Sequence, residues 1–474
     1  MRARKRVSQA QRLTSRESPS NPSRLLPLSR EIRAESRPLW RLAWPVILAE
    51  VGWHSMTLVD TMIVGRVSAE ALGGVSVGSA LFFVAAVFGI GMLLGLDYSV
   101  SHAVGRRRDD EAAHILGQGV LLATVIAVIL TFALRQATIL IAWIGVDPPV
   151  YEQAAGYLDA LSWSLAPILL FNALRRYIQA VGAVKVVMLV MISANLVNAA
   201  AAWVLVFGHL GFPALGARGA GWATLAARLY MLAGAAAFTW YRVRQTRGAR
   251  PLDRPWFDTK LQAELIGLGL PAALQLTLEV GVFSLATALA GRLGPVVLAA
   301  HHIVLSIAGL TFMLPLGLSS ASAVRVGHHL GSDQRAAAAH SGWTALIIGI
   351  AIMSCTGMIF WLAPRPLLSV FTNVPEVIAT GSSLLLIAAV FQIFDGIQVV
   401  GTGILRGTGE TRIPMVANLI GHWLIGLPTG YWLCFVAGWG VTGIWVGLSI
   451  GLIVVALALV VAWQRRAHGL LSPR

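Results

Sequence analysis

Residues 268–294 read LGLPAALQLTLEVGVFSLATALAGRLG. This stretch is long and apolar enough to cross the roughly 30 Å hydrocarbon core of a bilayer as one helix. A single carboxylate, Glu279, stands near its middle. A charge in hydrocarbon costs about 3 kcal/mol even on the gentlest scale, so an acid inside a membrane span is by default a candidate functional residue.

The same stretch has a counterpart earlier in the chain. Shifting the sequence by 226 positions aligns residues 42–114 with residues 268–340 without a gap. The shift matches Pro45 with Pro271, and it also matches several glycines and an Ala-Ala-His triplet. The chain is therefore an internal duplication.

Composition excludes an ordinary soluble domain. Hydrophobic residues make up 57% of the chain and charged residues 12%, whereas a soluble domain is about 25% charged. The net charge of +15 does not indicate nucleic-acid binding, because the basic residues gather in the first segment and in alternate loops. Cys355 and Cys434 lie far apart in apolar runs, so neither a disulfide framework nor a cysteine metal site is predicted.

Apolar runs of roughly 20 residues or more recur twelve times and predict an all-α membrane protein with both termini on one side. The expected spans are 39–65, 72–98, 116–142, 153–179, 186–208, 219–242, 262–290, 297–325, 340–363, 378–404, 413–436 and 440–463.

The distribution of Lys and Arg predicts the orientation. Most of them fall in the two tails and in alternate loops, including those near Arg106, Arg175, Arg325 and Arg406. By the positive-inside rule both termini are cytoplasmic. The opposite face and the span interiors keep Arg66, Arg135, Arg218, Arg228, Arg292 and Arg365.

The polar segment 243–261 falls between the sixth and seventh spans and is predicted to link two lobes. Six is an even number, so the second lobe enters the membrane as the first does, and the repeats are parallel with a substrate site between them. The expected organisation is a disordered basic tail at 1–38, with contact to anionic lipid as the alternative, lobes at 39–242 and 262–464, and a second tail at 465–474.

Four acids lie well inside the expected spans: Glu50, Asp60, Glu279 and Asp395. They are not related by the repeat, and for each the alternative role is a structural hydrogen bond to a neighbouring helix. A buried carboxyl can exchange a proton, bind Na⁺ or pair with a cationic substrate. These uses exclude one another, which is the simplest physical basis for antiport. Two acids nearer span ends, Asp97 and Asp159, are expected to be solvated or to cap helices.

Other polar and aromatic residues in the spans are candidates for an ion or substrate site. Asn195, Asn198 and Thr224 would hold either an ion or a neighbouring helix, and Glu50 is a further candidate for the same lobe. Aromatic side chains deep in the spans would stack on flat cations or pack against helices and lipid. These are Trp53, Trp203 and Trp423, with Phe391 as a further candidate.

Neither a metal site nor an ATP site is predicted. Histidines pair at 301–302 and 328–329, but no HExxH motif or cysteine spacing accompanies them. The phosphate-binding GxxxxGK[ST] pattern is missing from the sequence, and Lys5, Lys185 and Lys260 do not follow a glycine. Energy would therefore come from an ion gradient or from a partner, with no cofactor.

Several motifs resemble those of the multidrug and toxic compound extrusion (MATE) transporters, and of their NorM-like bacterial branch. These are VDTMIVGRV at 59–67, the stretch 268–294, the histidine-containing helix at 299–331 and FQIFDGIQVVGTGILRGTGETRIP at 391–414. The resemblance implies a V-shaped pair of six-helix bundles that exports organic cations against Na⁺ or H⁺.

The same resemblance assigns family roles to particular residues. The acids of the first, seventh and tenth helices fall on Asp60, Glu279 and Asp395, and the amino-terminal ion site falls on Asn198 and Thr224. Two positions depart from the family pattern. Ala202 stands where many members have Asn or Asp, and Phe391 stands where some have Tyr. Fewer oxygen ligands remain for Na⁺, which favours H⁺ as the coupling ion.

The sequence thus predicts a cation-coupled antiporter that exports organic cations, is not an enzyme and acts as a monomer in lipid. The alternative from the same superfamily is a flippase for a lipid-linked precursor, which would need Arg and Lys around the central cavity. A remote alternative, an intramembrane hydrolase, would need a nucleophile and base in adjacent spans, and no serine elbow or metal pair is found.

Overall fold

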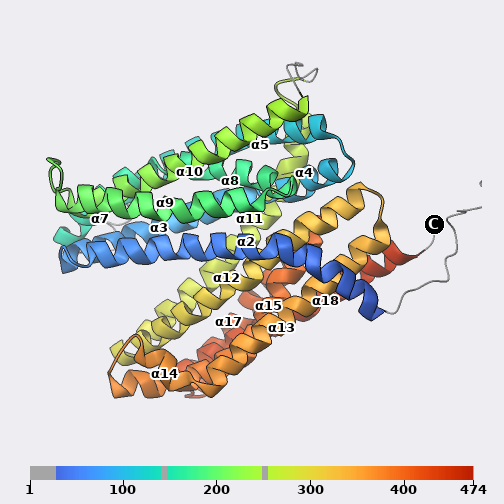
Figure 1. Ribbon diagram of the computed structural model, residues 1–474. Helices are drawn as coiled ribbons and strands as arrows, with labels where there is room; N and C mark the ends of the chain where they lie inside the picture. Colours follow the sequence, from blue (N-terminus) through green and yellow to red (C-terminus); the bar gives the residue numbers. More distant parts are fainter. Residues whose placement is uncertain (1–27, 140–146, 248–254, 473–474) are drawn as a thin grey trace, which may run out of the picture.

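The computed structural model describes residues 28–139, 147–247 and 255–472, and within these ranges the regular elements are helices (Figure 1). Most of the predicted tail 1–38 and the middle of the predicted linker lie outside the described residues. The helix α2 already begins at Leu28, so residues 28–38 belong to the same helix as the first expected span.

The helices of the first half follow the expected spans, with two breaks. Their bounds are α2 Leu28–Val64, α3 Ala69–Met92, α4 Gly95–Gly105, α5 Asp109–Gln136, α7 Pro148–Ser162, α8 Leu165–Ala180, α9 Val184–Phe207 and α10 Gly216–Arg247. The expected span 72–98 is split between α3 and α4, and α4 carries it on to Gly105. The expected span 153–179 bends by 43° between α7 and α8.

The second half repeats this order. Its helices are α11 Thr259–Gly291, α12 Pro295–Gly331, α13 Arg335–Leu362, α14 Pro364–Ser369, α15 Pro375–Gly407, α16 Arg412–Asn418, α17 Leu427–Tyr431 and α18 Val441–Leu471, with the π-helical segments η1 Leu419–Gly426 and η2 Trp432–Val436. The π-helical segments flank Pro428. A proline lacks an N–H and clashes with the preceding turn, so the regular hydrogen-bond pattern is disturbed in the turns around it.

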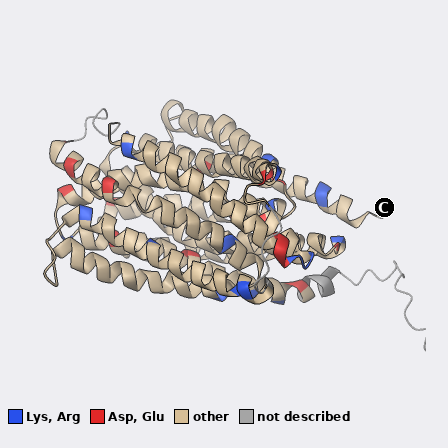
Figure 2. Ribbon diagram, turned by 90° about the horizontal axis from the view of Figure 1, so that it is seen from above, with Lys and Arg blue, Asp and Glu red and all other residues tan. Residues whose placement is uncertain are grey.

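The lengths and compositions of the helices fit a multi-pass membrane protein. Ten described helical segments are long and apolar enough to cross a membrane, and the bent pair α7–α8 would be an eleventh. The remaining expected span lies in α10, which carries Arg218 and Arg228 as well as a basic end. Charged residues lie mainly toward the two ends of the helices (Figure 2).

The two halves form two bundles that approach each other at one end and diverge at the other (Figure 1). We call the first the terminal end, because α2 begins there and α18 finishes there. The core of the first bundle is built around side chains such as Phe171 and Tyr177, and the cores of the second around Trp445 and Trp463. The predicted all-α fold of two parallel repeats is thus confirmed.

The bundles interlock where they meet. The amino-terminal half of α2 packs into the second bundle and α11 packs onto α3. Gly91 lies so close to Ala273 that a Cβ would collide with its backbone, and Gly317 is equally close to Ile47. These two contacts are related by the shift of 226 positions, so the duplication is expressed as a pseudo-symmetric interface.

Candidate functional site

Asp60 forms a polar cluster inside the first bundle. Its carboxylate lies near the distal end of α2 and is 8% exposed. The Asn198 amide, from α9, donates to one carboxylate oxygen at 2.5 Å, and the Thr224 hydroxyl, from α10, lies 3.1 Å from the other. The structure therefore brings three of the predicted residues together across three helices.

The Thr224 hydroxyl has one hydrogen and two oxygen acceptors within reach. It lies 3.1 Å from Asp60 and 3.0 Å from the backbone carbonyl of Ala220. When it donates to Ala220, its lone pair faces Asp60 and can accept only from a protonated carboxyl. The same geometry thus accommodates Asp60 with or without a proton.

Two other predicted residues of this lobe lie outside the cluster. Asn195 donates to the carbonyl of Met191 in its own helix, at 2.9 Å. The buried carboxylate of Glu50 forms an ion pair with Arg175. Ala202, one turn after Asn198, is fully buried and adds no ligand.

The second bundle holds two buried carboxylates, Glu279 on α11 and Asp395 on α15. Amide donors face Glu279, from Gln275 at 3.5 Å and from Asn418 at 3.4 Å. Asp395 is 5% exposed and lies close enough to Glu279 for the two negative charges to repel each other. A proton or a cation held between them would relieve this repulsion.

More polar groups surround this carboxylate pair. The side chain of His422 lies 3.2 Å from Gln398 and is fully buried. The Asn418 oxygen and one ring nitrogen of His422 have no hydrogen-bond partner within the described ranges. The sequence analysis missed these residues because single Gln, Asn and His side chains in separate apolar runs do not indicate that they lie at one site.

The predicted aromatic residues lie in different surroundings. Trp423 donates to the carbonyl of Leu278, at 3.0 Å, and so braces α11 beside Glu279. Phe391 is 4% exposed and packs edge-on against Trp445. Trp203 is 47% exposed and stacks on His209 near the end of α9.

Arg228 is a buried cation beside the Asp60 cluster that sequence reasoning left without a role. It lies one turn after Thr224 on α10 and donates to the Ser164 hydroxyl at 2.5 Å. Its guanidinium lies 4.4 Å above the ring of Phe82 and 5.8 Å from that of Trp53. It makes no ion pair with the acids of the described ranges.

Asp97 corrects one expectation. It was expected to be solvated or to cap a helix, but it is 1% exposed and lies 2.9 Å from Arg406 and 3.5 Å from Arg176. The helix continues through α4 beyond the apolar run, so the residue is buried between the bundles. Arg175 and Arg176, next to an expected loop, are buried in α8. Asp159 is 37% exposed and pairs with exposed arginines.

The histidines connect helices. His328 on α12 bonds to the carbonyl of Ala180 at 2.7 Å, across the two bundles, and His301 accepts from Trp445 at 3.1 Å. In the described part of the chain, His, Cys, Asp and Glu do not gather into a group that could hold a metal ion.

Comparison with known proteins identifies the family. The MatE family model matches residues 45–204 and 271–432, one segment in each bundle. The probable multidrug resistance protein NorM of Mesorhizobium japonicum is 37% identical over 92% of this chain and 94% of its own length. The multidrug resistance protein MdtK of Pectobacterium atrosepticum is 36% identical over 90% of this chain and 94% of its own.

Solved structures share the fold at low sequence identity. The eukaryotic MATE transporter AtDTX14 superimposes with a TM-score of 0.82 at 21% identity, covering 93% of this chain and 99% of that one. A MATE protein in a bent conformation gives 0.84 at 19% identity, covering 94% and 98%. The chain therefore belongs to the MatE family, the multidrug and toxic compound extrusion transporters.

Proposed function

We propose that this protein exports organic cations from the bacterial cytoplasm by antiport with H⁺. One observation carries the proposal: each bundle holds buried carboxylates that face neutral donors instead of arginines. Asp60 faces Asn198 and Thr224, and Glu279 faces two amides beside Asp395.

The contrast with the other buried acids gives this observation its weight. Arg175 is the ion-pair partner of Glu50, and Arg176 and Arg406 are those of Asp97. Those charges are compensated within the protein, as buried charges ordinarily are. A buried carboxylate that makes no ion pair is suited to a proton, a metal cation or a cationic substrate. The three acids that make no ion pair among the described residues are thus positioned to exchange one of these occupants for another.

Exchange of occupants couples the two fluxes. When a coupling ion neutralises the carboxylate, an organic cation loses its partner there. The coupling ion and the organic cation therefore bind to the carboxylate in turn. Such an ion drives a conformational change only if its affinity differs between the two states of the transporter. The approach of the bundles at the terminal end supports one of these states, open toward the distal end.

H⁺ is the proposed coupling ion. Ala202 supplies no oxygen beside Asp60, and Phe391 is packed in the core of the second bundle. The alternative hydrogen bonds of the Thr224 hydroxyl support a protonated Asp60 without rearrangement. Na⁺ would need more oxygen ligands than this cluster offers.

We place both termini in the cytoplasm and the protein, as a monomer, in the inner membrane, because the basic loops gather at the terminal end. The relatives are named as multidrug resistance proteins, which supports a transporter of drug-like molecules over an enzyme. The proposal requires no ATP and no cofactor.

Arg228 favours a second candidate function, the transport of an anionic or lipid-linked precursor. A buried guanidinium without an acidic partner is suited to a phosphate or carboxylate. One relative of the same fold, from Pyrococcus furiosus, is described as having a binding pocket of reversed polarity. Within the described ranges, three buried acids make no ion pair, whereas only one buried arginine of this site makes none. This excess of negative charge favours an organic cation over an anion as the substrate.

Ethidium efflux from everted vesicles tests the proposal, with pH and Na⁺ gradients imposed separately. We expect transport with a pH gradient alone and loss of that transport in Glu279→Gln. Glu376→Gln removes an exposed acid at the start of α15 and is the matched control. Efflux that requires Na⁺ at a constant pH gradient would refute H⁺ coupling. Export of an anionic dye but not of ethidium would favour the second function.

A further inference from the structure

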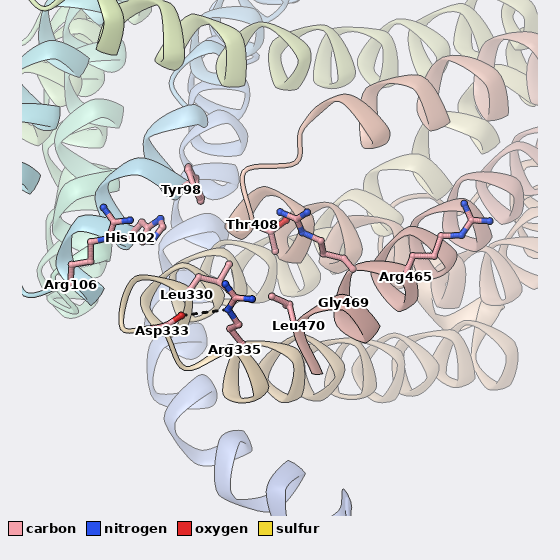
Figure 3. Close-up of a pocket in the computed structure, with 11 residues that line it drawn as sticks. Tyr98, His102, Arg106, Leu330, Asp333, Arg335, Thr408, Arg465, Gly469 and Leu470 are labelled. Carbon is pink, nitrogen blue, oxygen red and sulfur yellow. Dashed lines mark ion pairs between the residues drawn. The ribbon is translucent and has the colours of Figure 1, made fainter. Parts of the chain in front are cut away.

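A basic pocket lies between the two bundles at the terminal end (Figure 3). Its volume is about 540 Å³. The first bundle contributes α4 and the residue after it, and the second contributes the ends of α12, α13, α15 and α18. The lining residues are Tyr98, His102, Arg106, Leu330, Asp333, Arg335, Thr408, Arg465, Arg466, Gly469 and Leu470.

The charge of this pocket is unbalanced. Four arginines line it, and the one lining acid, Asp333, pairs with Arg335 at 3.4 Å. Arg106, Arg465 and Arg466 make no ion pair with the acids of the described ranges. This positive charge is not balanced by acids of the lining, so the pocket attracts an anion.

The chemistry of the lining selects the class of anion. Guanidinium groups bind phosphate oxygens in pairs of parallel hydrogen bonds. Leu330 and Leu470 add apolar surface beside the arginines (Figure 3). The pocket lies where the helices end, and in a membrane protein that level is the boundary between hydrocarbon and water. Basic pockets between helix ends at this level are suited to the headgroups of anionic lipids.

We propose that this pocket binds the phosphate of an anionic phospholipid headgroup. The phosphate would lie between Arg106 of the first bundle and Arg466 of the second, and the apolar residues would contact the lipid beyond it. Residues of both bundles line the pocket, so the bound lipid contacts both at once. The lipid therefore binds more tightly when the bundles meet at the terminal end than when they separate there.

The test measures binding of dye-labelled phosphatidylglycerol to delipidated full-length protein in an uncharged detergent. The principal variant is Arg106→Gln/Arg466→Gln, which removes one lining arginine from each bundle. Its matched control, Arg41→Gln/Arg412→Gln, removes two exposed arginines outside the pocket. Each arginine near an anionic headgroup contributes about a fivefold gain in affinity, so the principal variant should lose on the order of 25-fold. The control should lose less than about twofold.

Two further arms separate the sources of the phosphate and guard against misfolding. Arg106→Lys/Arg466→Lys keeps the charge but not the paired hydrogen bonds, and it should lose only a few-fold. Labelled phosphatidylcholine should bind much more weakly than phosphatidylglycerol. Displacement of the lipid by millimolar inorganic phosphate would overturn the lipid assignment in favour of a soluble anion. Equal losses in the principal and control variants, or equal binding of both lipids, would overturn the site itself.

Discussion

Replacing Arg406 by methionine removes a buried ion pair that joins the two bundles. Arg406 lies in the last turn of α15, and its side chain is 8% exposed. It donates at 2.9 Å to Asp97 on α4, whose side chain is 1% exposed. Methionine keeps much of the side-chain stem but leaves Asp97 with only Arg176, at 3.5 Å.

The expected cost follows from the burial of the pair. Breaking a buried ion pair by removing one partner costs about 3–5 kcal/mol. We take the lower value, about 3 kcal/mol, because Arg176 still compensates Asp97 in part. The pair spans the bundles, so this cost falls on the state in which they meet at the terminal end. At 1.36 kcal/mol for each tenfold change, the population of molecules whose bundles are separated at the terminal end should rise about a hundredfold.

Cysteine labelling measures this opening. Ser101 on α4 is fully buried beside Gly327 of α12, so a Ser101→Cys side chain reacts with a water-soluble maleimide only when the bundles separate. Cys355, which is exposed, and Cys434 would first be replaced by serine and alanine. We expect the labelling rate in detergent to rise about a hundredfold with Arg406→Met.

An exposed ion pair of similar length provides the control. Arg135 lies 3.0 Å from Asp159, but the two side chains are 42% and 37% exposed. Exposed pairs contribute about 0–1 kcal/mol, so Arg135→Gln should raise labelling no more than about fivefold. An unchanged labelling rate in folded Arg406→Met, or equal effects in the two variants, would show that the ion pair between Arg406 and Asp97 does not hold the bundles together at the terminal end.

Four further predictions concern single residues. Asp60→Asn should keep folded protein and lose gradient-driven efflux, whereas a structural role predicts near-normal efflux for Asn and loss of folded protein for Asp60→Ala; membrane expression and ethidium efflux separate the two. Asp395→Asn should likewise abolish pH-driven efflux without changing the elution volume on size exclusion, and wild-type rates would remove this acid from the mechanism. Arg228→Met should lower Tm by a few degrees, because it removes the hydrogen bond to Ser164 and the contacts with the rings of Phe82 and Trp53, and a raised Tm would show that these contacts do not compensate the buried charge. The pKa of Asp258 is lowered, chiefly by a backbone N–H donor at the start of α11; its ionised form therefore stabilises the fold above its usual pKa, and the Tm difference between wild type and Asp258→Ala should vanish as pH falls through the lowered pKa.

The sequence predicted the fold because its signals are local or periodic. Apolar runs of membrane length and the shift of 226 positions indicated the helices and the repeat without any knowledge of contacts. Breaks inside spans were not predicted, since the bend between α7 and α8 and the π-helical segments near Pro428 depend on packing as well as on local propensity. The boundary of α2 was set too late because its first turns are polar.

The candidate site was predicted in part for a related reason. An acid in an apolar run is conspicuous, so Asp60, Glu279 and Asp395 could be chosen from the sequence. An acid with a structural ion pair differs from one without it by a partner on a helix that is distant in sequence. The hydrophobic pattern of the sequence does not identify such partners. Glu50 looked like the other acids until its partner Arg175 was located.

The interlocking of α2 with the second bundle also bears on how the protein is made. Leu39, Ala43 and Ile47 are buried against residues such as Leu318 and Val400, which are synthesised much later. While the first half emerges from the ribosome, this face of α2 lacks its packing partner, so the first bundle cannot reach its final structure alone. Expressed by itself, the first half should be degraded rapidly. Co-expression of the two halves as separate chains should rescue the first half, because α2 can then pack against the second bundle of the other chain.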